Sequence, residues 1–399
     1  MRPNITLSIK KQAAEKIKKG FPLIEASSLR LGLPQIEEGS IVQLHDESGV
    51  FIGKGYYGKQ NKGIGWVLTK NETEKIDSDF FVNRIKSALV QRKDLFQDSA
   101  TTAFRLFNGE GDGIGGLTID YYDEFYVFTW YSEGIYEFRS DLYEAFQKVS
   151  SFKGIYEKKR FASKGEYVED DDFVMGERGK FPLLIKENHI EFAVYLNDGP
   201  MVGVFLDQRE VRNRIKETYA KGKTVLNTFS YTGAFSVAAA LGGAVKTTSV
   251  DLAKRSLPKT IEQFSVNKID YEAQDIVVMD VFNYFKYAKK KERVFDLVIL
   301  DPPSFARSKK HTFSAAKDYT GLLQEAIAIT EKDGVIVAST NCSTFNMAKF
   351  HKFIKEAFQN ERLNYEIVEQ FTLPQDFKTT KAFSEGNYLK VVFIRVKGR

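Results

Sequence analysis

The second half of the chain alternates short apolar runs with longer segments of helical periodicity. The apolar runs occupy residues 225–229, 245–250, 276–279, 297–300 and 335–339. Strands that alternate with helices in this way form parallel sheets with helices on both faces, and their ligands bind at the carboxyl ends of the strands. From residue 186 onward we therefore predict an α/β domain with a Rossmann-like sheet, in which residues 365–371 and 389–396 form the last pair of strands.

The first 185 residues follow a different pattern. A basic helical segment occupies residues 10–19. Three strand-like runs follow at 41–44, 49–57 and 63–68, and the last two contain glycines. Glycines allow the tight curvature of small barrels, so we predict a β-barrel-like module over residues 1–72. The polar segment 71–78 is the first boundary. Residues 73–185, with helical patterns at 80–96 and 137–149, are predicted as a central α+β domain, followed by the domain at 186–399.

A glycine-rich segment within the central domain resembles a phosphate-binding loop at first sight. It runs from Asn108 to Gly116 between two strand-like stretches. A phosphate loop of that kind continues into Lys-Ser or Lys-Thr and opens a helix. This segment lacks that pair and continues into a strand pattern, so a structural hairpin is favoured.

The turn after residues 225–229 suits a nucleoside cofactor. Gly233 opens the following helix, where free N–H groups and the missing side chain allow a ligand to approach. Asp251 ends the next strand, where an acid accepts hydrogen bonds from ribose hydroxyls. The three spaced glycines of a pyrophosphate site are missing, so we expect S-adenosylmethionine (SAM) rather than NAD, with a generic βαβ unit as the alternative. The candidate residues are Asn227, Phe229, Ser230, Tyr231, Thr232, Gly233 and Asp251.

Three further polar residues extend this candidate cofactor site. Gln208 and Arg209 lie at a predicted helix start before the first strand, and an arginine there could pair with the SAM carboxylate or with an RNA phosphate. Asp280 follows the third strand, where it could accept a hydrogen bond from the adenine amino group. An ordinary capped helix is the alternative in both places.

The motif Asp301-Pro302-Pro303-Ser304-Phe305 follows the fourth strand. Two prolines fix φ and stiffen the exit from the strand, so the turn could hold the edge of a base while Phe305 stacks on it. A purely structural turn is the alternative. Arg307 and the basic residues after it, through His311, suggest contacts with phosphate groups.

The single cysteine, Cys342, follows the fifth strand on the same predicted edge as Asp301. A thiolate there could add to C6 of a cytosine and activate C5 for methylation, a reaction that needs covalent assistance. The alternative is a small buried residue at a strand end, which is how most free cysteines behave.

The composition of the chain limits the kinds of partner that it is expected to bind. Residues 1–70 hold 11 Lys and Arg against 6 Asp and Glu, an excess that equals the net charge of +5 for the whole chain. A basic module joined to a catalytic domain suggests nucleic acid, although a solvated lysine-rich helix would look similar. One cysteine and 4 histidines without metal-ligand spacing predict neither disulfides nor a metal site. No apolar run could cross a bilayer, so we expect a cytoplasmic protein without a membrane partner.

These motifs together resemble the RlmI-type large-subunit rRNA methyltransferases of bacteria. The resemblance rests on residues 205–209, 226–233, 301–305 and 341–343 together with Asp251. It implies a PUA domain at the N-terminus, SAM as the cofactor, ribosomal RNA as the substrate and a homodimer. In that family a cysteine after strand five is the nucleophile for cytosine C5, and Cys342 matches it, so cytosine C5 is the first expectation for the target.

One departure favours another target atom. Residues 305–310 look closer to related rRNA guanine-N7 methyltransferases, in which an asparagine matches Asn341 and no cysteine acts as a nucleophile. N7 is already nucleophilic and needs only positioning. A guanine-N7 enzyme and a non-catalytic RNA-binding assembly factor that holds SAM as a structural ligand therefore stay open. The basic N-terminal module disfavours a small-molecule methyltransferase.

Overall fold

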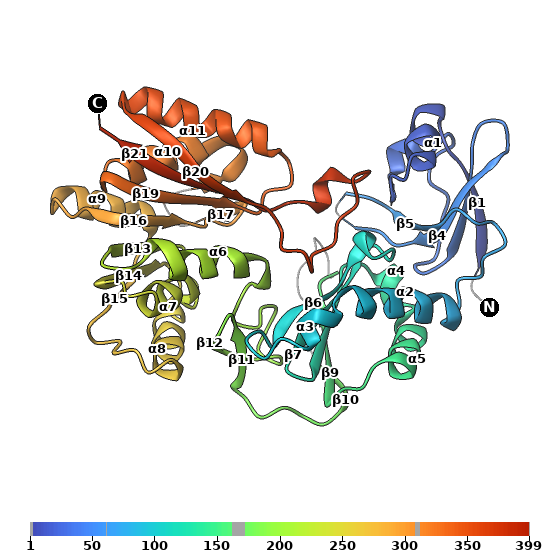
Figure 1. Cartoon of the computed structure of the whole chain (residues 1–399). Helices are drawn as coiled ribbons and strands as arrows, with labels where there is room; N and C mark the ends of the chain where they lie inside the picture. The colour runs from blue at the N-terminus through green and yellow to red at the C-terminus, as the bar shows by residue number, and fades with distance from the viewer. Residues whose placement is uncertain (1–2, 61, 162–171, 308–311, 399) are drawn as a thin grey trace. The chain divides into compact units, whose positions relative to one another are not determined.

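The chain divides into two compact units in the computed structural model, which describes residues 3–60, 62–161, 172–307 and 312–398. The first unit comprises Met1–Ile185, Val194–Val202 and Gln375–Gly386. The second comprises Lys186–Ala193, Gly203–Pro374 and Asn387–Arg399. The chain therefore passes between the units several times, and Figure 1 follows its course by colour. The elements at one of these passages are β11 (Leu183–Glu187) and β12 (Ile190–Val194).

The N-terminal part of the first unit is a curved sheet. Its strands within the described residues are ordered β1-β3-β4-β5-β2, with β1 parallel to β3 and the other pairs antiparallel. Register shifts interrupt β3–β4 and β4–β5 pairing, which bends the strands. The elements are β1 (Asn4–Ser8), α1 (Lys11–Lys18), β2 (Leu23–Ile24), η1 (Ala26–Ser28), β3 (Ile41–His45), β4 (Phe51–Tyr57) and β5 (Gly65–Thr69).

A second sheet with helices follows in the same unit. Its order within the described part is β10-β9-β8-β7-β6. The strands are β6 (Ala103–Asn108), β7 (Leu117–Tyr122), β8 (Phe125–Trp130), β9 (Gly154–Lys159) and β10 (Phe173–Gly176). The helices are α2 (Ser78–Gln91), α3 (Lys93–Phe96), η2 (Gly109–Gly111), α4 (Glu133–Tyr136) and α5 (Arg139–Val149).

One hydrophobic core runs through both parts of the first unit. Tyr56 and Trp66 from the N-terminal sheet belong to the same buried cluster as Phe81, Phe107 and Trp130 from the second sheet and its helices. Burial of large aromatic side chains is the main stabilising contribution of such a cluster. The three-domain division at residues 72 and 185 stays a prediction.

The second unit is built on a mostly parallel sheet. The order of its strands among the described residues is β15-β14-β13-β16-β19-β21-β20, with β21 antiparallel to both of its neighbours. The strands are β13 (Thr224–Thr228), β14 (Lys246–Asp251), β15 (Asp275–Val278), β16 (Phe295–Leu300), β19 (Thr330–Thr340), β20 (Asn364–Phe371) and β21 (Lys390–Lys397). A short pair, β17 (Phe305–Arg307) and β18 (Thr312–Ser314), follows β16.

Alternate residues of this sheet enter two different cores. Val298 and Leu300 pack in one cluster with α9 (Val281–Lys290), α10 (Ala315–Ile327) and α11 (Met347–Glu361). Their neighbours Leu297 and Ile299 pack in another. Since side chains alternate between the faces of a strand, the two clusters cover opposite faces. The second cluster includes residues of α6 (Arg209–Arg214), η4 (Ile215–Tyr219) and α7 (Ala234–Leu241); α8 (Ser256–Val266) follows β14.

The predicted fold class is confirmed, with local differences in the elements. The last two strands pair as expected, and the glycine-rich segment joins the antiparallel strands β6 and β7 as a hairpin. The helix expected over residues 80–96 is broken at Arg92, whose φ is −107°. Arg92 is buried, and its guanidinium donates to both carboxylate oxygens of Asp112 at 2.8 and 2.7 Å, a tertiary contact that periodicity does not reveal.

A buried ion pair fixes the segment before the parallel sheet. Arg212 donates to both oxygens of Glu187 at 2.7 and 2.6 Å and to the carbonyl of Phe205 at 2.7 Å. Both charged side chains are almost completely buried. Removal of one partner leaves the other charge without compensation, which typically costs several kcal/mol.

We therefore expect Glu187→Gln to destabilise the second unit by about 3 kcal/mol. The matched control is Glu217→Gln, because Glu217 makes an exposed ion pair with Lys216 and should change stability by less than about 1 kcal/mol. Native-state hydrogen exchange of the β13 and β16 amides reports this unit separately. Equal effects of the two substitutions would contradict a structural role for the buried pair.

Candidate active site at the carboxyl edge of the sheet

The turn between β13 and α7 has an unusual backbone. Phe229, Tyr231 and Gly233 all have positive φ, at 54°, 52° and 79°. A side chain at Gly233 would place its Cβ 2.6 Å from Cγ2 of Thr260, so only glycine fits. Left-handed conformations at Phe229 and Tyr231 cost energy and concentrate at ligand sites. The turn lies at the carboxyl ends of β13 and β14, where the sequence places the cofactor (Figure 1).

Asp251 orients this turn. One carboxylate oxygen accepts from the backbone N–H of Tyr231 at 2.9 Å, and the other accepts from the N–H of Ala253 at 2.8 Å. Each oxygen of a carboxylate can accept further hydrogen bonds. The acid is thus fixed in position at the end of β14 and keeps acceptor capacity for a ligand. The Thr232 hydroxyl donates to the carbonyl of Gly203 at 2.7 Å, which fastens the turn from the other side.

Two buried acceptors at the same edge have no hydrogen-bond partner among the described residues. They are Oδ1 of Asn227 and Oε1 of Gln208. The Asn227 amide donates to Ser236, and the Gln208 amide donates to Asp301 and Ser339 at 3.1 and 2.8 Å. An unpaired buried acceptor costs about 1–3 kcal/mol. SAM carries an ammonium, ribose hydroxyls and an adenine amino group as donors, so this set of residues fits that cofactor.

Asp301 follows the last residue of β16 and lies among polar neighbours, including Gln208 and Ser339. Burial raises the pKa of Asp301 to about 6 from its ordinary value near 3.8, and the neighbouring carboxylate of Asp207 acts in the same direction. Hydrogen bonds from Ser339 and Gln208 oppose the rise. Tyr319 donates to the backbone carbonyl of Ser339 at 2.6 Å. Sequence reasoning missed Ser339 and Tyr319, because the link between them and Asp301 is made only when β16 and β19 lie side by side.

The residues after Pro302 lie toward the surface of the protein. Pro302 is buried, whereas Pro303 is exposed and Phe305 is 63% exposed. The Ser304 hydroxyl donates to Oδ1 of Asn341 at 2.7 Å, which joins the ends of β16 and β19. An exposed aromatic ring beside a fixed polar pair can stack on a base and hydrogen-bond its edge. Arg307 belongs to β17, but its side chain and residues 308–311 lie outside the described part of the structure.

Arg209 and Asp280 are engaged with their own helices. Arg209 is buried, with Nε donating to Glu210 at 3.2 Å. Asp280 caps α9 and accepts from the backbone N–H of Asn283 at 3.2 Å. The structure thus has the helix cap that the sequence allowed as an alternative. Contacts of Arg209 with the SAM carboxylate and of Asp280 with adenine stay predictions.

Cys342 lies within a hydrophobic cluster. Its side chain is 6% exposed and packs in the cluster that contains Ala338 and Phe345. Sγ lies 3.1 Å from the hydroxyl of Thr344. The ammonium of Lys390 is buried nearby, 5.3 Å from the centre of the Phe345 ring, and donates to the carbonyl of Tyr388. Burial lowers the pKa of Lys390, while the neighbouring Cys342 partly opposes this change. The only signal for Lys390 in the sequence is that this lysine begins an apolar strand.

Comparison with known proteins decides the family. A model of the S-adenosylmethionine-dependent methyltransferase family matches residues 160–393, and a PUA-like domain model matches residues 7–70. The chain belongs to the SAM-dependent methyltransferase family. It is an enzyme whose cofactor is SAM, and the expected PUA-like domain at the N-terminus is confirmed.

Two relatives in sequence and one in structure extend this result. "Putative ribosomal RNA large subunit methyltransferase YwbD" of Bacillus subtilis (strain 168) is 63% identical, covering 98% of this chain and 99% of the relative. Ribosomal RNA large subunit methyltransferase I of Aeromonas salmonicida (strain A449) is 30% identical, covering 92% and 94%. The crystal structure of SMU.776, "a putative methyltransferase complexed with SAH", matches with a TM-score of 0.91 at 40% identity, covering 98% of this chain and all of that one.

A metal site and a membrane-spanning helix are two other features that a chain of this kind could contain. Among the described residues, no group of three or more His, Cys, Asp or Glu side chains is placed to hold a metal ion. The helices within the described ranges are all too short or too polar to span a bilayer.

The raised pKa of Asp301 predicts a stability change with pH. Because the folded-state pKa is higher than the unfolded-state pKa, the folded state binds more protons, and stability falls as pH rises from about 4 through 6. Asp301→Asn removes this loss. It should therefore stabilise the second unit at pH 8 by on the order of 2–3 kcal/mol, with little effect at pH 4.

Hydrogen exchange of the β16 amides at moderate denaturant concentration, repeated across this pH range, measures the change. Asp280→Asn is the control, because that aspartate caps a helix at the surface edge of the same sheet. A stability difference between wild type and Asp301→Asn that stays constant with pH would contradict the raised pKa.

Proposed function

We propose that this methyltransferase modifies a base of large-subunit ribosomal RNA. The names of its relatives, its PUA-like domain and its basic first 70 residues support that substrate. The observation that carries the proposal is the exposed turn at Ser304 and Phe305, which follows β16 at the strand edge that also holds the cofactor turn. Such a substrate implies a cytoplasmic location. A homodimer stays a prediction.

The residues around SAM each have a distinct task. Asn227, Gln208 and Asp251 would hold the cofactor through the acceptors described above. When bound, SAM supplies an electrophilic methyl group, so the protein has only to select the base and hold it in place. Phe305 would stack on a base that leaves its helix, and the Ser304–Asn341 pair would hydrogen-bond its edge.

Guanine N7 fits this geometry better than cytosine C5. Methylation at C5 requires a thiolate that reaches C6 of the base. The Cys342 side chain is 6% exposed and packs among apolar residues, as a structural cysteine does. Asn341, its neighbour, is exposed and paired with Ser304. N7 is already nucleophilic, so positioning by such groups is sufficient.

Cytosine C5 is the second candidate because of Lys390. Its ammonium is buried beside Cys342, and a nearby positive charge favours a thiolate. In this mechanism the thiolate would add to C6 and the electron pair of the C5–C6 bond would make C5 nucleophilic. Elimination of the thiolate with loss of the C5 proton would then restore the ring.

The two candidates predict opposite results for Cys342→Ala. For guanine N7, the variant should retain methyl transfer to a transcript of large-subunit rRNA, because the thiol only fills space. For cytosine C5, transfer should disappear while SAM still binds. Tritiated SAM and nucleoside digestion of the product measure both the rate and the base. A small-subunit transcript tests the substrate, and equal labelling of both transcripts would contradict the proposed specificity.

Asp251→Ala tests the cofactor site separately. Loss of a carboxylate that orients the turn and would accept ribose hydrogen bonds should weaken SAM binding by about 10- to 100-fold. A weakening of this size corresponds to at most two charge-assisted hydrogen bonds. Isothermal titration calorimetry with SAM measures this. Glu272→Ala, at an exposed carboxylate in the loop before β15, is the control. An unchanged SAM affinity in Asp251→Ala would remove Asp251 from the cofactor site.

A further inference from the structure

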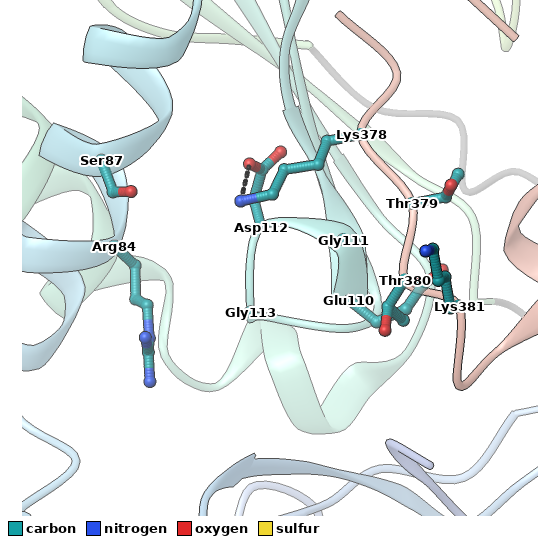
Figure 2. A pocket seen from close by; sticks show the side chains of 10 residues that line it. All are labelled: Arg84, Ser87, Glu110, Gly111, Asp112, Gly113, Lys378, Thr379, Thr380 and Lys381. Atoms are coloured by element: carbon teal, nitrogen blue, oxygen red, sulfur yellow. Dashed lines mark ion pairs between the residues drawn. The ribbon is translucent and has the colours of Figure 1, made fainter. Parts of the chain in front are cut away.

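The first unit contains a polar cavity that the methyltransferase reaction does not use. Its volume is about 430 Å³. Arg84 and Ser87 from α2 line one side, the turn Glu110–Gly113 lines the floor, and residues 378–381 line the other side. Figure 2 shows the two outer walls facing each other across the turn. A volume of this size is in the range of small-ligand sites.

The walls of the cavity are tied together by hydrogen bonds. Arg92 binds Asp112 and also donates to the carbonyl of Asp376 at 2.7 Å. The Asn108 amide donates to the carbonyl of Lys378 at 2.9 Å. At Gly111 a Cβ would lie 1.8 Å from that carbonyl, so the close approach requires glycine. Residues 375–386, which come from far along the sequence, are thereby held against the glycine-rich turn.

The charges around the cavity favour an anion. Arg84, Lys378 and Lys381 contribute three positive charges. Of the two acids, Asp112 pairs with the buried Arg92 and also lies 3.7 Å from Lys378, the ion pair that Figure 2 marks with a dashed line. Burial raises the pKa of the other acid, Glu110, to about 7, with Asp112 acting in the same direction, so part of the Glu110 population is uncharged at neutral pH.

Two contacts fix the position of the Arg84 guanidinium. It stacks on the Phe80 ring at 4.7 Å and donates to the carbonyl of Leu68 at 3.2 Å. Its Nε is buried and has no hydrogen-bond partner among the residues that the structure describes. A buried unpaired donor of a charged group is unfavourable until an acceptor binds. The hydroxyls of Ser87, Thr379 and Thr380 add donors around the same space.

We propose that this cavity binds a phosphate group of the RNA backbone and gives the enzyme a contact with RNA outside the methyltransferase domain. A phosphodiester has acceptor oxygens and one negative charge, which match a site made of an arginine, two lysines and hydroxyls. The RNA source rests on the proposed function, whereas the phosphate site itself rests on the cavity. The hairpin turn between β6 and β7 thus contributes to phosphate binding without a Lys-Ser or Lys-Thr pair.

The test is the salt dependence of RNA binding. Each phosphate contact contributes about 0.7–0.9 to the slope of log K against log salt concentration. Lys378→Ala and Lys381→Ala should each reduce that slope, with the double variant losing about 0.7–0.9, and each should weaken binding to all sequences. Filter binding to a large-subunit rRNA transcript and to poly(U) measures the slope. Lys86→Ala, on the exposed face of α2 outside the cavity, is the matched control.

The outcomes separate this proposal from the proposed function. Unchanged slopes on both RNAs in Lys378→Ala and Lys381→Ala overturn the RNA contact at this cavity, whether or not the enzyme methylates rRNA. Reduced slopes on both RNAs support the site even if no methyl group enters the transcript. Titration with inorganic phosphate and AMP tests the other source. If either saturates the wild type at low millimolar concentration while the slopes stay unchanged, the ligand is a free phosphate compound, and the RNA version is wrong. Native-state hydrogen exchange of the β6 and β7 amides confirms that the first unit is folded in each variant.

Discussion

The hydrogen bonds of the Gln208 amide join the parts of this site. Nε2 of Gln208 donates to both Asp301 and Ser339, and these residues end β16 and β19. The segment before the sheet is therefore bound to the two strands whose ends carry the residues that we propose contact the base. Gln208 itself is held because Arg212, one turn later, is buried against Glu187 and the carbonyl of Phe205. Direct pairing of β13 with β16 fixes the cofactor turn relative to the proline turn, and the Gln208 connection adds the segment before the sheet to them.

The same edge of the sheet carries energetic costs that a ligand can relieve. Three features are unfavourable in the protein alone. They are the positive φ values at Phe229 and Tyr231, the burial of the ionisable Asp301 and the two unpaired acceptors. They occur together where SAM and a base would supply hydrogen-bond donors. The surrounding sheet compensates through two well-packed cores, one on each face. The stability of the packed sheet thus allows the unfavourable features at its carboxyl edge to persist.

Much of this organisation can be predicted from the sequence, because local patterns determine it. The strand periodicity predicts the parallel sheet, and Gly233 and Asp251 lie at the edge that we propose for the cofactor. Contacts between distant segments cannot be found this way. Ser339 and Tyr319 have no local motif, and the break of the helix at Arg92 depends on Asp112. The same holds for residues 375–386, which leave the strands of the second unit to line a cavity of the first unit.

Nucleoside mass spectrometry of large-subunit rRNA, from a strain that lacks this gene and from its parent, is the most direct measurement. A base methyltransferase that relies on positioning by Ser304, Phe305 and Asn341 predicts the loss of one 7-methylguanosine. Loss of one 5-methylcytidine instead would assign the nucleophile to Cys342 and contradict the positioning mechanism. An unchanged set of methylated nucleosides in this RNA would contradict the proposed substrate itself.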